Sequence, residues 1–332
     1  MINFGIIGAG SIAHAMAGTL SHMKEARAYG IASRSIDKAK QYQKQYHMEK
    51  AYGSYEELVT DPEIDVVYIA TPHAFHYEQA KLCLEHGKHV LCEKAFTANA
   101  KQAEELISLA SEKKLFLGEA MWTRFMPIIK KMKEIITEGV IGDVTFLTAN
   151  LNFPMLQKER LIQPELAGGA LLDVGIYPLT IASIVMGDDI EKVVATAVLT
   201  DKGMDKMGQY TLVYSNGTMA DLNSGMCSFS DGNAVIYGTK GQIILEGTNC
   251  PRGFKVLDHT WNLIMDISAE QVADYPCEDT LTGYEYEVRA CAEAIENGNR
   301  EFEQMPLSLT LKMMKLMDEI RSQMGVRYPF ED

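Results

Sequence analysis

The sequence contains 332 residues, a length that favours two domains of ordinary size over one. Apolar residues make up 47% of the chain and charged residues 23%, which is typical of a soluble globular protein and argues against disordered or fibrous classes. The net charge is −14 and no basic block is present, so we expect neither nucleic acid nor an anionic membrane as a partner.

The cysteines and the apolar segments indicate the cellular compartment of the protein. No two of the six cysteines form a CxxC pair, so neither a zinc ribbon nor a dithiol redox motif is predicted. The first residues lack the basic and long apolar segments of a secretion signal, and Asp173 interrupts the best candidate for an apolar span of about 18 residues. We therefore expect a cytoplasmic protein. The cysteines lie at positions 83, 92, 227, 250, 277 and 291.

The first 120 residues alternate short apolar runs with helix-prone segments. The run at 64–70 is apolar almost throughout, as expected for a strand in a sheet that is covered on both faces. Repeated strand–helix units of this length predict an α/β domain over 1–120 with a parallel sheet and right-handed crossovers. The predicted strands are 2–7, 28–32, 64–70, 89–92 and 116–118, and the predicted helices are 13–23, 36–47, 75–85 and 98–112.

Longer alternating strands begin near residue 143. Several of them meet at turn motifs, Ser215-Asn216-Gly217 and Thr239-Lys240-Gly241, which favour hairpins. This part predicts an α+β domain over 121–332 with a large open, mainly antiparallel sheet, and its last helix is expected to pack back on the first domain. The predicted strands are 144–151, 193–199, 209–214, 218–222 and 234–245, and the predicted helices are 284–297 and 307–324.

The segment Gly8-Ala9-Gly10-Ser11-Ile12-Ala13 follows the first strand and opens a helix, and it fits the pattern G-x-G-x-x-[GA]. In such a loop the first glycine permits the tight turn, the second lets the backbone approach a pyrophosphate, and the small third residue packs the helix on the strand. A plain tight turn is the alternative. The flanking strand, the helix and the later strand–helix units favour a Rossmann-type dinucleotide site.

The end of the second strand selects the nucleotide. An NAD site usually has an acid there, whereas this chain has Ser33, Arg34 and Ser35, with Lys38 one helical turn on. A guanidinium can stack on adenine and make paired hydrogen bonds to a 2′-phosphate. The residues therefore predict NADP, with NAD possible, and the alternative is a solvated Arg34 at a helix start.

Two further clusters lie at the carboxyl ends of predicted strands, where ligands bind in such sheets. Thr71, Pro72, His73 and His76 follow the strand at 64–70, and we expect them to contact ribose and nicotinamide or to cap a helix. The two histidines have no carboxylate or cysteine beside them, so no metal is predicted. Glu93-Lys94 follows the next strand, where a lysine is of functional interest.

A glycine-rich helix start at 168–177 carries Asp173 and Tyr177, four residues apart. On a helix that spacing places both side chains on one face. The pair is consistent with an acid–base pair, and equally with a capping aspartate and a core tyrosine, and spacing alone leaves the two interpretations open.

Several motifs in order resemble one family. These are the loop at 8–13, TPHxxH at 71–76, CEK at 92–94, EAMWTRFMP at 119–127, GGALLDVGIY at 168–177 and YPFE at 328–331. Together they resemble the glucose–fructose oxidoreductase/inositol dehydrogenase (Gfo/Idh/MocA) family over essentially the whole chain, nearest the dimeric dihydrodiol dehydrogenases. The resemblance implies an active site between the domains and a homodimer through the C-terminal sheet.

The resemblance also implies residue roles. Lys94 matches the lysine that contacts the nicotinamide ribose and the substrate hydroxyl, Tyr177 the catalytic tyrosine, and Asp173 the acid four residues before it. Trp122 and Arg124 match residues near the cofactor and the pocket mouth. One departure is Ala95, which replaces the proline that follows a cis bond in relatives, so the Lys94–Ala95 peptide is either cis or trans.

The implied activity is NADP-dependent hydride transfer to or from a secondary alcohol or carbonyl group of a sugar, polyol or cyclic diol. Trp122, Phe153 and Tyr284 are candidate walls of the pocket. Two alternatives differ in class: a non-catalytic NADP-binding sensor or scaffold, and a reductase of double bonds similar to biliverdin reductase. The presence of Lys94, Asp173 and Tyr177 together argues against a sensor.

Overall fold

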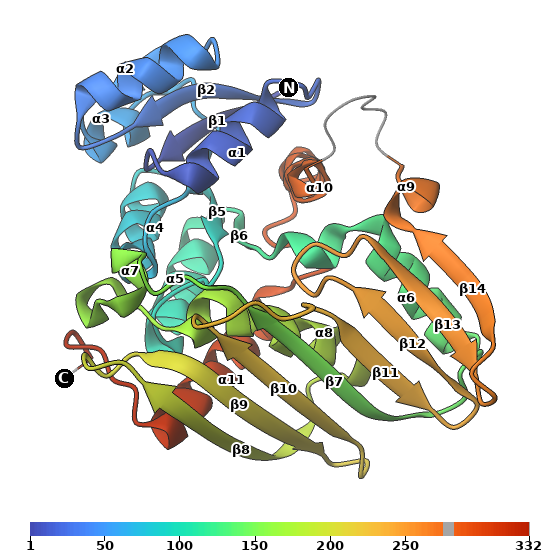
Figure 1. The fold of residues 1–332 in the computed structure, drawn as a ribbon. Helices are drawn as coiled ribbons and strands as arrows, with labels where there is room; N and C mark the ends of the chain where they lie inside the picture. The colour runs from blue at the N-terminus through green and yellow to red at the C-terminus, as the bar shows by residue number, and fades with distance from the viewer. Residues whose placement is uncertain (275–281, 332) are drawn as a thin grey trace. The chain divides into compact units, whose positions relative to one another are not determined.

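A parallel six-stranded sheet forms the centre of the N-terminal part of the chain (Figure 1). We describe residues 1–274 and 282–331 of a computed structural model, and these divide into two units. The first unit comprises Met1–Trp122 and the described part of 275–314, and the second comprises Thr123–Asp274 and the described residues from Lys315 on. Each unit is described by itself.

The first unit has the strand order β3-β2-β1-β4-β5-β6, which reverses direction between β1 and β4. All pairs are parallel, so the predicted Rossmann-type sheet is confirmed, and ligands of such sheets bind at this switch point. The strands are β1 (Ile2–Ile7), β2 (Ala26–Ala32), β3 (Lys50–Tyr52), β4 (Val66–Ile69), β5 (His89–Glu93) and β6 (Leu117–Ala120).

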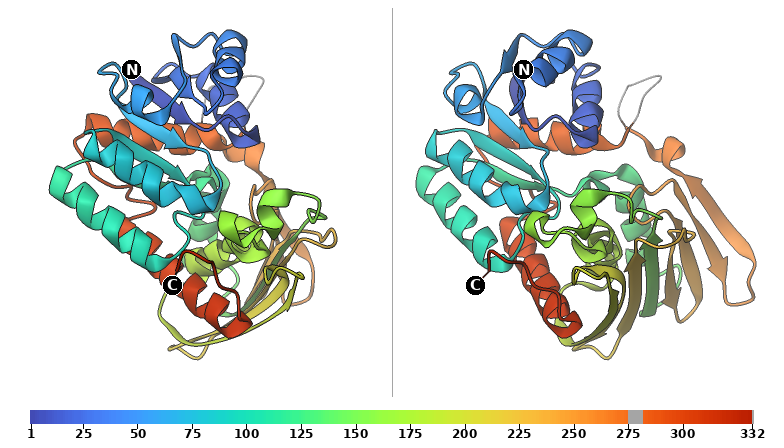
Figure 2. Two further views of the ribbon diagram at one scale, coloured as in Figure 1. Left: turned by 90° about the vertical axis from the view of Figure 1, so that its left-hand side faces the viewer. Right: turned by 60° about the vertical axis from the view of Figure 1, so that its left-hand side comes forward.

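Helices cover both faces of this sheet (Figure 2). Right-handed crossovers place α1 on one face and α4 and α5 on the other, and α10 packs against α1 and β2 although it is remote in sequence. The helices are α1 (Ser11–Leu20), α2 (Ile36–Gln45), α3 (Tyr55–Val59), α4 (His76–Glu85, after a 3₁₀ turn at His73–Phe75), α5 (Ala100–Lys113) and α10 (Tyr284–Glu296).

Local chemistry accounts for these elements. All four residues of β4 are buried, which matches the apolar run in the sequence. Side-chain caps begin three of these helices: Ser35 Oγ accepts the Lys38 N–H of α2, Ser54 Oγ the Glu57 N–H of α3, and Asn99 Oδ1 the Gln102 N–H of α5. The short β3 and α3 were not predicted, because three to five residues carry too little periodicity to detect.

The second unit contains an eight-stranded sheet in the order β14-β13-β12-β11-β7-β10-β9-β8. Every pair is antiparallel except β7 with β10, so the predicted large, mainly antiparallel sheet is confirmed. The strands are β7 (Val144–Asn152), β8 (Ile190–Leu199), β9 (Asp205–Tyr214), β10 (Met219–Gly225), β11 (Ala234–Gly238), β12 (Gly241–Glu246), β13 (Gly253–Asp258) and β14 (Leu263–Ser268).

The remaining helical segments belong to the second unit, apart from α11, which begins in the first unit and ends in the second. The predicted hairpin at Ser215-Asn216-Gly217 is confirmed, with Gly217 at a φ of 82° between β9 and β10. The helices are α6 (Pro127–Thr137), α7 (Glu159–Ile162), α8 (Ile176–Met186, after helical turns at Pro164–Leu166 and Leu171–Gly175), α9 (Ala269–Val272) and α11 (Leu307–Met324).

Several elements differ from the sequence expectations. The run at 234–245 is two strands, β11 and β12, that meet at the predicted turn. The strands β13 and β14 were missed, and β14 is partly exposed on both sides and lacks alternation. The missed α6 has a readable pattern, with Pro127 in its first turn and buried Ile128, Met132 and Ile135 along one face. The predicted domain ranges of 1–120 and 121–332 differ from the packing units, because α10 returns to the first sheet.

One apolar segment contradicts the expectation that Asp173 interrupts every long apolar span. Among the described residues, Pro164–Met186 is long and apolar enough to cross a membrane by length and composition. Its most apolar window is 78% buried, and α8 packs against β7 and β10, which fits a core helix.

Candidate active site

The glycine loop after β1 has the geometry of an anion site. Gly8 has a φ of 100°, and a Cβ there would lie 2.8 Å from Ala70 O, so only glycine fits the turn. A Cβ on Gly10 would meet nothing within 4 Å, so the space in front of this residue is open. The N-terminus of α1 has no side-chain cap and no acid in its first turn. Its N–H groups therefore suit a phosphate, and the residues present fit a dinucleotide.

Three aromatic side chains support this loop. The Tyr42 hydroxyl of α2 donates to Gly10 O at 3.0 Å, and the His14 ring stacks on Tyr42 with centroids 4.0 Å apart. The Tyr46 hydroxyl lies 2.8 Å from His14 Nδ1. Sequence reasoning missed this support because it comes from a helix that sits about thirty residues further on and carries no motif.

The turn after β2 presents the two predicted cations to solvent. Arg34 and Lys38 are exposed, whereas Ser33 is buried and its Oγ accepts the Ser35 N–H at 3.2 Å. Burial raises the pKa of Tyr55, and the nearby Arg34 guanidinium opposes that rise. Asp37 is exposed in the first turn of α2. Exposed Arg34 and Lys38 leave two cationic groups available to bind a phosphate at this turn.

His76 connects two loops at the carboxyl edge of the sheet. Its Nδ1 lies 2.9 Å from Ala95 O and its Nε2 lies 2.8 Å from Thr71 O, so both ring nitrogens face backbone carbonyls. Burial lowers the pKa of His76. The Thr71 hydroxyl donates to Gln79 Oε1, and the buried His73 ring packs edge-on against His76. These contacts place Thr71, Pro72 and both histidines at the switch-point edge.

The Lys94–Ala95 peptide is cis, which answers the question that the sequence left open. The Lys94 N–H donates to Glu93 Oε2 at 3.2 Å, and the Tyr68 hydroxyl donates to Glu93 Oε1. Lys94 itself is half-buried at the end of β5. Glu93 thus fixes the backbone at the lysine.

The helix α10 carries a buried carboxyl group, Glu287. Within the part of the chain that the structure describes, neither side-chain oxygen of Glu287 has a hydrogen-bond partner. Burial, and then the charges of Glu93 and Glu285, raise the pKa of Glu287 well above its ordinary value. No motif pointed to this residue, because Glu93, whose charge acts on it, lies some 200 positions earlier in the chain.

Trp122 and Arg124 belong to different units, although the sequence placed them together. The buried Trp122 ring stacks on Tyr284 of α10 with centroids 4.4 Å apart in the first unit. Arg124 Nη2 donates to Ser183 Oγ of α8 at 2.7 Å in the second unit. Phe153, also in the second unit, packs edge-on against Phe229, which is 76% exposed.

Asp173 and Tyr177 lie at the predicted helix start in the second unit. Both are buried, and Asp173 sits in one wider π-type turn that precedes α8, while Tyr177 is in the first turn of α8. Arg160 Nη1 of α7 lies 2.8 Å from Asp173 Oδ1, an ion pair that sequence reasoning missed. Asp205 Oδ2 accepts the Leu171 N–H that opens this segment, so Asp205 supplies a capping carboxylate there.

Across residues 1–274 and 282–331, no group of three or more His, Cys, Asp or Glu side chains is arranged to hold a metal ion. The five described cysteines are free thiols, and Cys277 lies outside the described residues.

Comparison with known families gives two matches. The family described as "Oxidoreductase family, NAD-binding Rossmann fold" matches residues 2–120, and the "GFO/IDH/MocA C-terminal domain" matches residues 129–244. These ranges coincide with the parallel sheet of the first unit and with most of the open sheet of the second.

Similar proteins extend over nearly the whole chain. A trans-1,2-dihydrobenzene-1,2-diol dehydrogenase of Xenopus tropicalis is 33% identical over 98% of this chain and 99% of its own. A D-xylose 1-dehydrogenase (NADP(+)) of Hypocrea jecorina is 35% identical over 84% of this chain and 78% of its own. Among solved structures, the 3-ketoreductase KijD10 of Actinomadura kijaniata, in complex with NADP and TDP-benzene, is 26% identical with a TM-score of 0.88, covering 98% of this chain and 99% of its own.

Proposed function

The chain belongs to the GFO/IDH/MocA oxidoreductase family, and we propose that it transfers hydride between NADP and a secondary alcohol or carbonyl group of a sugar, polyol or cyclic diol. The observation that carries the proposal is the open glycine loop with an uncapped α1 N-terminus at the switch point of the sheet. The substrate class follows the diol and xylose dehydrogenases among the relatives.

The choice of NADP is supported by charge and by the relatives. The turn after β2 carries Arg34 and Lys38, both exposed, and has no carboxylate between Ser33 and Ser35. The xylose dehydrogenase is named for NADP(+), and KijD10 was crystallised with NADP. When bound, the nicotinamide ring would exchange hydride with the carbinol carbon of the substrate.

Residues of this chain would handle the proton and the charge. Tyr177 would accept the hydroxyl proton during oxidation and return it during reduction, a role implied by its match to the family's tyrosine. The Lys94 ammonium would polarise the substrate oxygen and favour its loss of the proton. Asp173, paired with Arg160, would orient a second hydroxyl of the substrate.

Cofactor preference is tested by fluorescence titration with NADPH and NADH. Arg34→Gln should weaken NADPH binding tenfold or more, about 1.4 kcal/mol, and leave NADH binding unchanged. Lys44→Gln, at the exposed far end of α2, is the matched control and should change neither. Equal affinity of the wild type for both cofactors would overturn the NADP assignment.

Turnover is tested with a panel of sugars, polyols and cyclic diols. Tyr177→Phe should lower turnover by about 10²- to 10⁴-fold at unchanged NADPH affinity. Tyr214→Phe is the control, because Tyr214 is also buried, on β9, and its hydroxyl has no hydrogen-bond partner among the described residues. Undiminished turnover of the Tyr177→Phe variant would reject the tyrosine role. Protein that binds NADPH but oxidises nothing in the panel would favour a sensor or a double-bond reductase.

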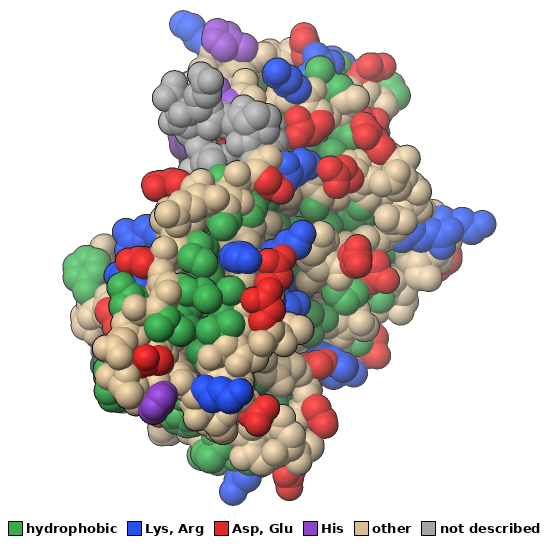
Figure 3. All heavy atoms as spheres, turned by 90° about the vertical axis from the view of Figure 1, so that its right-hand side faces the viewer, with side chains coloured by type: hydrophobic (Ala, Val, Ile, Leu, Met, Phe, Trp, Pro, Cys, Tyr) green, Lys and Arg blue, Asp and Glu red, His purple; other side chains and the backbone are tan. Residues whose placement is uncertain are grey.

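We also propose a cytoplasmic homodimer that associates through the open sheet. Val194 and Val198 of β8 and Met207 of β9 are exposed on its outer face, whereas the alternate residues Tyr210 and Leu212 are buried on the inner face. Hydrophobic side chains also gather over β14 at the far edge of the sheet, where Leu263 and Ile264 are exposed (Figure 3). Exposed apolar patches of this kind mark interaction surfaces.

A further inference from the structure

The segment that carries Asp173 and Tyr177 is held at its start by groups from distant parts of the second unit. The Leu171 N–H donates to Asp205 Oδ2 at 2.7 Å, and the Tyr328 hydroxyl donates to Gly168 O at 3.0 Å. Both side chains are buried. One comes from the first residue of β9 and the other from the turn that follows α11. The four residues from Gly168 to Leu171 are therefore fixed from two sides.

Two glycines of this segment leave no room for a side chain. Gly169 has a φ of 113°, and a Cβ there would collide with Asp205 Oδ1. A Cβ on Gly168 would lie 2.6 Å from Leu161 O, the carbonyl that accepts the Gly169 N–H. Gly169 thus lets the buried Asp205 carboxylate approach the backbone directly, and Gly168 lets the Leu161 carbonyl do so.

The carboxyl-terminal motif at 328–331 has a place in the same assembly. The Arg321 guanidinium of α11 lies 4.4 Å from the Tyr328 ring centroid and pairs with Glu331 and Asp318. Phe330 stacks on Tyr328. These contacts hold the Tyr328 ring, whose hydroxyl donates to Gly168 O. The proposed hydride transfer does not by itself explain why the 328–331 segment carries these residues.

Asp205 is 1% exposed, and three charged or titratable side chains act on it. They are Arg321 of α11, Tyr328 of the terminal turn and Tyr210 of its own strand. Burial raises the pKa of Asp205 to about 7, against the N–H donors of Leu171 and Ala170 and the charge of Arg321. The protonated form of Asp205 is therefore favoured at a higher pH than that of an exposed aspartate.

We propose that Asp205 is a positioning residue, whose carboxylate fixes the start of the Leu171–Gly175 turn so that Asp173 and Tyr177 keep the orientation needed for catalysis, with Tyr328 as a second support. This proposal rests on the proposed function, because it assumes that Tyr177 accepts and returns the hydroxyl proton of the substrate. The Leu171–Gly175 turn is of the π type, which is rare and is found frequently at functional sites, and it leads directly into the first turn of α8 that carries Tyr177.

The test compares Asp205→Asn and Tyr328→Phe with two controls that lack these contacts, Asp221→Asn on β10 and Tyr214→Phe on β9. In each test variant, hydrogen exchange of the amides at 170–177 should accelerate at least tenfold, and kcat should fall about tenfold at unchanged NADPH affinity. The controls should change neither quantity. A purely structural cap would accelerate exchange and leave kcat per folded molecule unchanged, and that result would overturn the proposal.

A pH profile provides the second readout. Protonation weakens the Asp205 carboxylate as an acceptor, so wild-type kcat should decline as the pH falls through about 7. Asp205→Asn should lack this decline, and Asp205→Glu should restore it in part. An unchanged profile in Asp205→Asn would overturn the proposal.

Two further outcomes are separable. If Asp205→Asn does not fold, Asp205→Glu takes its place in both measurements, and Tyr328→Phe, which removes one hydroxyl and keeps the ring, tests the second support. If the wild type oxidises no alcohol, the proposed function fails, and the exchange rates at 170–177 still decide whether Asp205 fixes the segment. Unchanged exchange in both test variants would refute the positioning role whatever the activity.

Discussion

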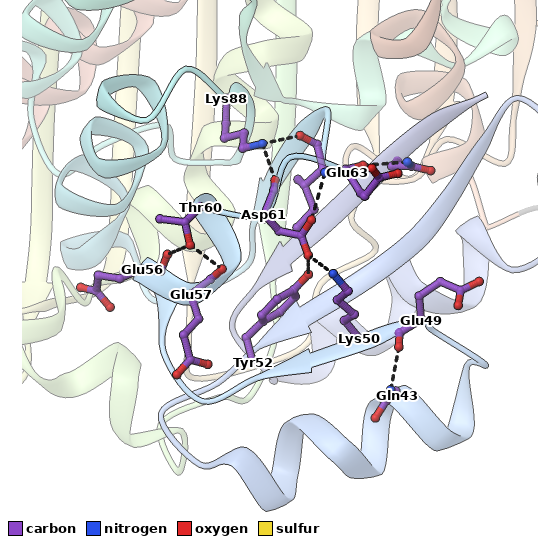
Figure 4. Close-up of polar contacts among 12 residues, drawn as sticks. Gln43, Glu49, Lys50, Tyr52, Glu56, Glu57, Thr60, Asp61, Glu63 and Lys88 are labelled. Atoms are coloured by element: carbon purple, nitrogen blue, oxygen red, sulfur yellow. Dashed lines mark hydrogen bonds and ion pairs between the residues drawn. The ribbon is translucent and has the colours of Figure 1, made fainter.

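Asp61 illustrates how single polar residues hold the first unit at the edge opposite the glycine loop (Figure 4). Its buried Oδ2 accepts from Lys50 Nζ at 2.5 Å and from the Tyr52 hydroxyl at 2.7 Å. Its Oδ1 accepts the Glu63 N–H, and the Lys88 ammonium donates to the Asp61 backbone carbonyl. These donors outweigh burial and lower the pKa of Asp61 to about 2.

Asp61→Asn should therefore destabilise the protein in a pH-dependent way. The folded pKa lies below the unfolded value, so the ionised carboxylate stabilises the fold above about pH 4 and this contribution is lost as the pH falls toward 2. Urea unfolding should show a loss of about 2 kcal/mol at neutral pH that shrinks toward about pH 3. Asp37→Asn, exposed on α2, is the control. An equal loss at both pH values would contradict the ionic role.

Glu287 gives the opposite expectation. Its folded pKa is raised, so the unfolded chain releases a proton that the folded chain keeps, and stability falls as the pH rises above the ordinary glutamate range. Glu287→Gln imitates the protonated acid and should stabilise the protein at about pH 8 while changing little near pH 4. Thermal unfolding at both pH values measures this, with the exposed Glu293→Gln of the same helix as control. A destabilised variant at pH 8 would show that the ionised form is required.

At the scale of elements, the glycine loop separates folding from binding. Gly8→Ala forces a side chain into a φ of 100° and against the Ala70 carbonyl, so it should lower the melting temperature and the yield of folded protein. Gly10→Ala has an ordinary φ of −104° and open space, so it should fold normally. The added methyl group stands where a pyrophosphate approaches, and NADPH affinity should fall tenfold or more. Normal NADPH binding by Gly10→Ala would place the cofactor elsewhere.

Elements with strong local patterns were predictable from sequence. The helix at 307–324 was placed to the residue, and the strand at 66–69 was recognised from its apolar run. The amphipathic α6 was readable but missed. The edge strand β14 was not readable, because a strand that is half-exposed on both sides has no alternation of burial.

Contacts between residues far apart in the sequence limit how much of the candidate site can be predicted from the sequence. The glycine loop and the helix start at 168–177 were found because their residue types are unusual for their position. Asp205, Tyr328, Arg160 and Glu287 were not found, since each acts on a partner that only folding brings near. A buried carboxylate on a backbone N–H has no sequence signature of its own.

At the scale of the whole molecule, the candidate groups are divided between the units. The glycine loop, Arg34 and Lys94 belong to the first, and Asp173 and Tyr177 belong to the second. We therefore expect cofactor affinity to respond to substitutions in the first unit and turnover to substitutions in either. A loss of turnover at unchanged NADPH affinity is therefore expected for substitutions in the second unit, such as Tyr177→Phe, and a loss of NADPH affinity for substitutions in the first, such as Arg34→Gln.

The proposed homodimer is also a property of the whole molecule, and two apolar surfaces of the second unit compete for it. Val198 and Met207 are neighbours on adjacent strands at 48% and 40% exposure, whereas Leu263 lies on the edge strand β14. Val198→Asp should convert a dimer of twice the 36.9 kDa chain mass into monomers in sedimentation equilibrium, and Leu263→Asp should leave the dimer intact.

Net charge makes the same prediction testable without a substitution. Each chain carries −14, so a dimer carries twice that, −28, and the two chains repel one another at long range. Salt screens this repulsion beyond about 8–10 Å at physiological ionic strength. The dissociation constant of the wild-type dimer should therefore decrease as the salt concentration is raised. An apolar contact does not lose strength under these conditions, whereas an ion-paired interface would. Dissociation promoted by salt, or by Leu263→Asp rather than Val198→Asp, would move the interface away from the outer face of β8 and β9.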